Sequence, residues 1–99
     1  MSQTEYKYDV RATNRFKKHA QLVKKRNTKQ SEKLKETVEL LAKGETLPTR
    51  YHDHELSGEF TGNRECHILP DLLLIYKIYK DILILELIDT GTHSDLFNL

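Results

Sequence analysis

The chain has 99 residues and a formal net charge of +1 at neutral pH, a length that suits one domain, residues 1–99, with one modest core. Its single cysteine, Cys66, excludes an internal disulfide and a cysteine-rich zinc site, as is typical of a reducing cytoplasm. No apolar run approaches the roughly 20 residues that cross a bilayer, and the first residues lack a signal-peptide pattern. The composition predicts a cytoplasmic protein without a membrane partner.

Charge is divided unevenly along the chain. Residues 1–50 hold 13 Lys and Arg against 6 Asp and Glu, a net charge of +7, whereas residues 51–99 hold 3 against 9, a net charge of −6. A basic half beside an acidic half with reactive side chains suggests that one part holds a polyanion and the other acts on it. On charge alone, a solvated lysine-rich helix exterior is the simpler explanation.

A short strand is predicted near the start of the chain. Residues 6–10 alternate in a way that places Tyr6, Tyr8 and Val10 on one face. We expect this strand to join a sheet formed by the second half of the sequence.

Two amphipathic helices are predicted next. Apolar residues recur at helical spacing from Asn14 to Arg26 and again from Lys29 to Lys43, where Gly44 ends the pattern. Between the helices, Asn27 is expected to adopt left-handed backbone and Thr28 to cap the second helix. The two apolar stripes require a sheet to cover them.

The second half predicts a loop and three strands. A loop over residues 45–60 precedes a strand over 64–69, and a hairpin then joins strands over 72–79 and 82–88. Residues 94–99 are long enough for one helical turn. The expected class is α+β, with the helix pair packed on one face of a small, mainly antiparallel four-stranded sheet.

Strand periodicity assigns faces around Cys66. Alternation places Cys66 and Ile68 on one side, and Glu65, His67 and Leu69 on the other. If Cys66 and Ile68 meet the helices, His67 faces the open side of the sheet.

Four side chains are expected to converge at one edge of this hairpin: His54, His67, Asp71 and His93. Imidazole exchanges protons near neutral pH, and a carboxylate can orient it or act as a base. RNA carries its own nucleophile, the 2′-hydroxyl, so its cleavage needs a base, an acid and stabilisation of the phosphorane, but no metal or cofactor. The set is sufficient for such a nuclease.

Each residue also has a structural explanation. A loop histidine is commonly solvated, Asp71 follows Pro70 as turn residues do, and His93 could cap the last helical turn. The segment 52–54, His-Asp-His, resembles a metal clip, but no second spaced ligand pair supports it. Cys66 is interpreted as a small buried apolar residue.

The motifs of the second half resemble the YafQ branch of the RelE-type bacterial toxins. The resemblance spans nearly the whole chain and rests on the order and spacing of five segments: Asp53-His54-Glu55-Leu56-Ser57-Gly58, Arg64-Glu65-Cys66-His67, Pro70-Asp71 with Leu73-Leu74-Ile75-Tyr76, Thr90-Gly91-Thr92-His93, and Leu96-Phe97.

This resemblance implies a RelE-like fold and a type II toxin that cuts mRNA on the ribosome and inhibits translation. It implies neutralisation by a cognate antitoxin, with a free monomer and a hetero-oligomeric complex. The implied active-site residues are His54, His67, Asp71 and His93, with Phe97 as a base-stacking surface. The basic helices would face ribosomal RNA through Lys17, Lys18, Lys24, Lys25 and Arg26.

Two positions depart from the branch. An arginine that could neutralise the scissile phosphate often precedes Thr-Gly-Thr-His, where this chain has Asp89, and a tryptophan often occupies the position of Leu72. A carboxylate beside a phosphate is unfavourable, so either Arg64 or Lys77 substitutes or the activity is weak. The alternative function is a non-catalytic module that binds RNA, the ribosome or the antitoxin.

Overall fold

Two helices form where the sequence has amphipathic spacing. In the computed structural model, which describes residues 5–97, α1 spans Asn14–Arg26 and α2 spans Thr28–Ala42. The bounds of α1 are as predicted, and α2 lies one residue earlier than predicted at each end. The hydroxyl of Thr13 caps α1 by accepting a hydrogen bond from the Phe16 backbone N–H at 3.0 Å.

A single residue, Asn27, joins the two helices. Its backbone N–H donates to the carbonyl of Val23, and its side chain accepts from the Gln30 N–H, so it ends α1 and caps α2. With φ −161° and ψ 112°, Asn27 is extended, so the prediction of left-handed backbone was wrong. Thr28 is the first residue of α2 and not its cap.

Five strands form one mixed sheet. The α+β class is as predicted, and the fifth strand is β2, a two-residue pairing inside the predicted loop. In the order β1-β5-β4-β3-β2, β1 runs parallel to β5 and the other neighbours are antiparallel. The strands are β1 Asp9–Ala12, β2 His54–Glu55, β3 Arg64–Leu69, β4 Leu72–Tyr79 and β5 Ile84–Gly91.

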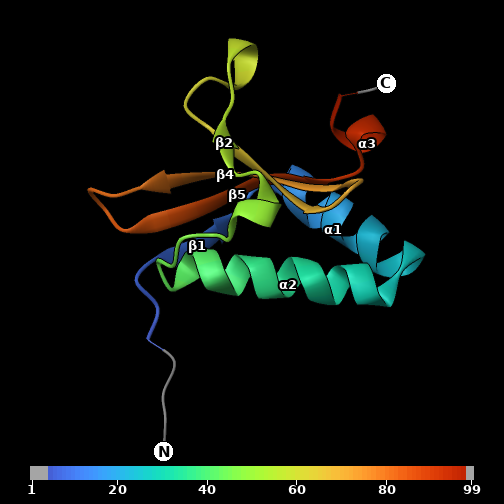
Figure 1. The fold of residues 1–99 in the computed structure, drawn as a ribbon, viewed down its shortest axis with the longest axis horizontal. Coiled ribbons are helices and arrows are strands. Elements are labelled where there is room, and N and C mark those ends of the chain that lie inside the picture. The colour runs from blue at the N-terminus through green and yellow to red at the C-terminus, as the bar shows by residue number, and fades with distance from the viewer. Residues whose placement is uncertain (1–4, 98–99) are drawn as a thin grey trace, which may run out of the picture.

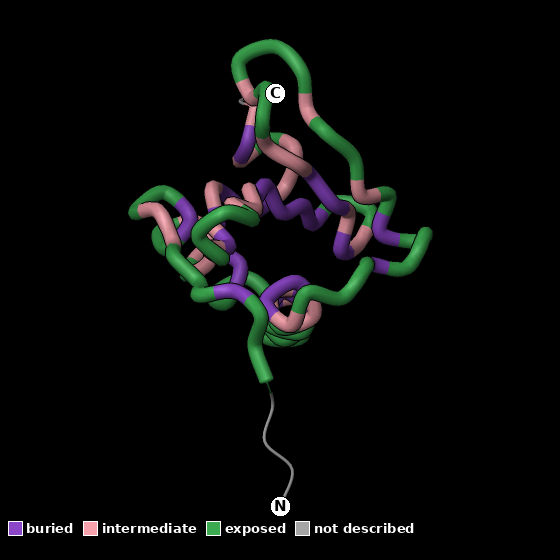
Figure 2. Tube along the Cα trace, turned by 90° about the vertical axis from the view of Figure 1, so that its left-hand side faces the viewer, coloured by how far each residue is buried: buried purple, intermediate pink, exposed green. Residues whose placement is uncertain are grey.

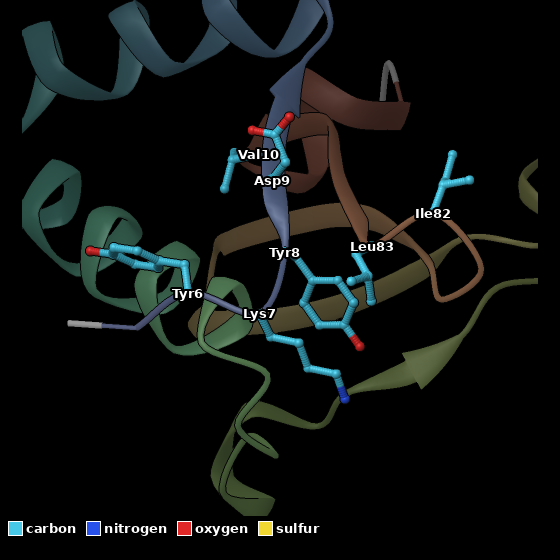
Figure 3. A pocket seen from close by; sticks show the side chains of 7 residues that line it. All are labelled: Tyr6, Lys7, Tyr8, Asp9, Val10, Ile82 and Leu83. Carbon is cyan, nitrogen blue, oxygen red and sulfur yellow. The ribbon is translucent and has the colours of Figure 1, made fainter.

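The first strand starts later than predicted. Tyr8 is buried, whereas Tyr6 and Val10 are exposed, and Figure 3 shows the Tyr6 and Tyr8 side chains pointing away from one another. The Tyr8 backbone N–H donates to the carbonyl of Ala42, at the end of α2. This segment therefore binds the helix before Asp9 enters the sheet, and the predicted common face of the three side chains does not form.

The last strand is also displaced from its predicted bounds. Ile82 and Leu83 are exposed in the turn, and Leu83 has φ +55°, a left-handed conformation that a strand cannot contain. The strand begins at Ile84 and continues to Gly91, with a register shift opposite Ile75. The apolar run in the sequence extends into the turn, which is why its start was misplaced.

Apolar side chains are buried on both faces of the sheet. The larger cluster includes residues of α1 and α2, and the smaller one includes Phe60 of the 3₁₀ turn η2, Gly58–Phe60, and Leu96 and Phe97 of the short helix α3, His93–Phe97. Figure 1 shows α2 and α3 on opposite sides of the sheet. Figure 2 shows the buried residues along the middle of the molecule and the exposed ones on its projecting loops. The smaller cluster contains Leu73, Ile75 and Leu96, with Leu56, Phe60, Ile88 and Phe97 against them.

The two faces of β3 are mostly as predicted. Cys66 and Ile68 are buried in the cluster beside the helices, and His67 lies on the other face. Leu69 was assigned to the wrong face: it packs against the helix-side cluster because the register shifts between His67 and Leu69. A third element of the loop, the 3₁₀ turn η1, Thr49–Tyr51, precedes β2. Within residues 5–97 no helix is long and apolar enough to cross a membrane.

Candidate active site

A buried carboxylate lies at the centre of the site. Glu65, on β3, has a side chain only 8 % exposed, and its Oε1 lies 3.5 Å from Nε2 of His54 and 3.4 Å from Nε2 of His67. Its other oxygen, Oε2, is buried and has no hydrogen-bond partner among the residues that the structure describes. One oxygen of this buried carboxylate therefore faces two imidazoles, whose side chains are 47 % exposed in His54 and 29 % exposed in His67.

Imidazole rings surround His67. Its ring centroid lies 6.0 Å from that of His52, 6.1 Å from that of His54 and 5.9 Å from that of His93. These rings come from the loop before β2, from β2, from β3 and from the start of α3. The convergence predicted for His54, His67 and His93 is thus present in the structure.

Asp71 orients His93 from the turn between β3 and β4. Its Oδ1 accepts hydrogen bonds from the His93 backbone N–H at 3.0 Å and from Nδ1 at 2.7 Å. The backbone hydrogen bond, followed by the side-chain one, lowers the pKa of Asp71 below its ordinary value. Because Nδ1 donates to Asp71, Nε2 of His93 is left to exchange a proton with a ligand.

The neighbouring side chains of Asp53 and His54 point to opposite sides. His54 donates from Nδ1 to the carbonyl of His52 at 2.6 Å, which directs its Nε2 to Glu65. Asp53 instead pairs with Arg64 on the other side. The His-Asp-His segment therefore does not form one clip, and within residues 5–97 no group of three or more His, Cys, Asp or Glu side chains is placed to hold a metal ion.

An aromatic pair lies one helical turn beyond His93. The rings of Phe97, on α3, and Phe60, on η2, meet edge to face with centroids 6.0 Å apart. Both side chains are partly exposed and pack against the smaller cluster. An aromatic surface is thereby present beside the imidazoles, on the same face of the sheet.

Neither Arg64 nor Lys77 joins the imidazoles. Arg64 Nε lies 3.3 Å from Asp53 Oδ1, and its Nη1 lies 3.5 Å from Glu55 Oε1, so its charge is committed to two carboxylates. The Lys77 ammonium lies over the ring of Tyr79, 4.8 Å from the ring centroid. In this arrangement, therefore, neither residue takes the place of the arginine that often precedes Thr-Gly-Thr-His, as the sequence analysis had suggested.

Asp89 is turned toward α1. Its side chain is 4 % exposed, with Oδ2 2.6 Å from Arg15 Nε and Oδ1 2.6 Å from His19 Nδ1. Because the carboxylate is buried and paired with a guanidinium, its charge is neutralised within the protein. The unfavourable interaction that we expected between the Asp89 carboxylate and the scissile phosphate is therefore much reduced.

The basic side chains of α1 divide into two groups. Lys17, Lys18, Lys24 and Lys25 are exposed on the helix. Arg26 is instead held by a bidentate ion pair with Asp95.

Two residues of the cluster were absent from the predicted site. Glu65 shares the open face with His67 two residues away on the same strand, a periodicity that could have identified it. His52 has φ +47°, and its ring reaches His67 only because the chain turns sharply before β2. No pattern in the sequence indicates that turn.

Comparisons with known proteins agree with the fold. The family described as "Bacterial toxin of type II toxin-antitoxin system, YafQ" matches residues 8–98. The mRNA interferase toxin YafQ of Escherichia coli K12 is 39 % identical over 90 residues, which cover 90 % of this chain and 95 % of the relative.

Solved structures agree with this similarity. The crystal structure of YafQ from E. coli BL21(DE3) superposes with a TM-score of 0.83 at 36 % identity, covering 91 % of this chain and 98 % of that one. YafQ in the E. coli DinJ-YafQ toxin-antitoxin complex superposes with a TM-score of 0.79 at 35 % identity, covering 92 % and 98 %. The fold is that of a small α+β toxin of a type II toxin–antitoxin system. The chain belongs to the YafQ family, as its motifs predicted.

Proposed function

We propose that this toxin is an endoribonuclease that cleaves mRNA on the ribosome by general acid–base catalysis, without a metal or cofactor. Its curated relative in E. coli is named an mRNA interferase and aligns with nearly the whole chain. The observation that carries the mechanism is the arrangement around His67, whose ring lies 5.9 Å from that of His93 and whose Nε2 lies 3.4 Å from Glu65. At this separation, two acid–base groups can act on the same phosphodiester.

The RNA itself supplies the nucleophile. One imidazole or carboxylate takes the proton of the 2′-hydroxyl as that oxygen attacks the phosphorus, and another group protonates the departing 5′-oxygen. His93, oriented by Asp71, fills one of these roles through Nε2. His54 and His67, which share Glu65, provide the partner group and the charge that stabilises the phosphorane.

Other parts of the surface would hold the RNA. Phe97 offers an aromatic face on which a base can stack. The exposed lysines of α1 would contact phosphates of mRNA or ribosomal RNA and set the orientation of the toxin. These are Lys17, Lys18, Lys24 and Lys25.

The proposed partners follow from the family. Because YafQ of E. coli has been solved in a complex with the antitoxin DinJ, we infer that a cognate antitoxin protein neutralises this toxin in a hetero-oligomer. The free toxin would be a cytoplasmic monomer that acts on ribosomes.

The mechanism is tested by primer extension on an mRNA translated in vitro. The wild-type protein should create new 5′ ends that require ribosomes. His93→Ala and His67→Ala should each lower the cleavage rate by about 10²–10⁴-fold, the usual contribution of one acid–base group.

A pair of turn carboxylates gives a matched control. Asp71 lies in the turn before β4 and Asp81 in the turn after it, and both are exposed. Asp71→Ala should slow cleavage, whereas Asp81→Ala should not. Unchanged cleavage in both histidine variants would refute the mechanism, and intact mRNA on toxin-bound ribosomes would identify the wild-type protein as a non-catalytic binder.

A further inference from the structure

One face of α1 carries three side chains, two arginines and one histidine, that contact the segment holding His93. Arg15, His19 and Arg26 recur at helical spacing, so they project from the same side of the helix. Each pairs with an acidic residue that flanks His93 in the sequence: Arg15 and His19 with Asp89, and Arg26 with Asp95. The segment is therefore held from both sides.

The first anchor, at Asp89, is buried. Both of its oxygens are within 2.6 Å of a nitrogen of α1, and Oδ1 also accepts from the Thr90 backbone N–H at 2.8 Å. The start of α1 reinforces this contact, because the Thr13 hydroxyl donates to the carbonyl of Ile88 at 2.7 Å. The end of β5 is thus fixed to the helix immediately before the turn to His93.

The second anchor, at Asp95, organises the start of α3. The Thr92 backbone N–H donates to Asp95 Oδ2, and the Asp95 backbone N–H donates to Thr92 Oγ1, each at 3.0 Å. Arg26 holds the same carboxylate through Nη1 at 2.6 Å and Nη2 at 3.2 Å. The hydrogen bond from Arg26 is the main reason why the pKa of Asp95 lies well below its ordinary value.

The backbone between the two anchors has no free space. Gly91 has φ +138°, and a Cβ at this position would lie 2.6 Å from Asp95 Oδ2. Glycine is required here because the chain passes against the second anchor in a conformation that other residues rarely adopt. A shift of either anchor would therefore be transmitted to His93.

We propose that Arg15, His19 and Arg26 are positioning residues that hold the His93 imidazole in register with Asp71 and His67 through the anchors Asp89 and Asp95. The proposal rests on the function proposed above, in which His93 exchanges a proton with the RNA. In this proposal the Asp89 carboxylate anchors the catalytic segment to α1. Arg26 has a different role from the neighbouring exposed lysines, because the Arg26 guanidinium is engaged within the protein.

The two possible roles of Arg26 predict different kinetics. As a positioning residue it acts on kcat, whereas as an RNA contact it acts on KM for mRNA-loaded ribosomes. A misplacement near 1 Å can cost about 10²-fold in rate. We expect Arg26→Ala to lower kcat about 10-fold or more, with KM changed by less than about 2-fold.

The acidic partner supplies the decisive variant. Asp95→Asn keeps an oxygen that can accept from Thr92 and removes a negative charge, which would strengthen RNA binding if electrostatics alone mattered. We expect it to lower kcat as Arg26→Ala does, and the double variant to be no worse than either single variant. Asp89→Asn should lower kcat in the same way.

Two controls accompany these variants. Lys29→Ala removes an exposed cation at the start of α2 and should leave kcat unchanged. Arg26→Lys keeps the charge but not the bidentate contact, so it should recover only part of the kcat lost in Arg26→Ala. Full recovery in Arg26→Lys, or a raised KM in Arg26→Ala with unaltered kcat in Asp95→Asn, would overturn the proposal.

A readout without RNA separates this proposal from the catalytic one. The Cε1–Hε1 resonance of His93 in the intact protein should move in Arg26→Ala and Asp95→Asn but remain in place in Lys29→Ala. If His93→Ala still cleaves mRNA while this resonance moves as expected, the catalytic role fails and the anchoring contact stands. A resonance that does not move in either variant refutes the anchoring.

Discussion

Glu65 Oε1 lies 3.4 Å from His67 Nε2, and the opposite oxygen of the same carboxylate is buried without a partner among residues 5–97. A buried carboxylate with an unsatisfied oxygen is costly to the folded state. Such costs are commonly retained where a group serves the chemistry of a site. This relationship suggests that activity and stability will respond in opposite directions when the charge is removed.

Glu65→Gln should therefore lose cleavage activity without losing stability. We expect the cleavage rate to fall by about 10²-fold or more, because the amide cannot exchange a proton with His54 or His67. The melting temperature should stay equal or rise, because the amide removes a buried charge. Rates from primer extension and melting curves from circular dichroism measure the two effects. Glu59→Gln, an exposed substitution on η2, is the control, and a parallel loss of rate and stability in Glu65→Gln would contradict the prediction.

The ion pair between Arg26 and Asp95 predicts a dependence of stability on pH. The pKa of Asp95 is lowered in the folded protein, so the stabilisation is fully present above the unfolded value near ~4 and declines as the pH falls below it. The melting-temperature gap between wild type and Asp95→Asn should narrow progressively below about pH 4. Curves that stay parallel from neutral pH to pH 2 would contradict this.

Cys66 should be unreactive in the folded protein. Its side chain is buried on the helix side of β3, and burial raises the pKa of its thiol to about 12. At pH 8 almost none of it is thiolate, which is the form that attacks disulfide reagents. Ellman's reagent should react with the chain only after unfolding in urea. Stoichiometric reaction of the native protein would place this thiol at the surface.

Leu85 and Ile82 form a matched pair around the start of β5. Leu85 is fully buried, whereas Ile82 is 63 % exposed in the preceding turn. Leu85→Ala should lower the free energy of unfolding by about 2–5 kcal/mol, because a cavity remains in the core. Ile82→Ala should change it by less than about 0.5 kcal/mol. Urea denaturation measures both, and equal losses would mean that β5 begins earlier than Ile84.

The sequence predicted most of the fold because its strongest periodic patterns coincide with packed elements. The spacing of apolar residues located α1, and β4 has the predicted bounds. The errors lie where a contact outside the pattern decides the structure. Tyr6 leaves the sheet because the chain binds the end of α2, and Leu83 leaves it because its backbone is left-handed.

The residues of the candidate site that belong to local sequence motifs were predictable. His67 and His93 were named from their positions beside strands, and the structure brings their rings together. Glu65 was placed on the correct face but not assigned to the site. The pairing of Asp89 with Arg15 was not foreseen, because it joins distant parts of the chain that no local pattern connects.

The position of β5 in the sheet has a consequence for folding. This strand lies between β1 and β4, and His19 reaches Asp89 across a separation of 70 residues. Contacts between such distant parts of a chain form slowly, because the loop between them must close first. Until β5 docks, neither the anchors on α1 nor the register of the last hairpin exists. A partly folded molecule therefore lacks the proposed nuclease site, and we expect catalytic competence to arise only with the complete fold.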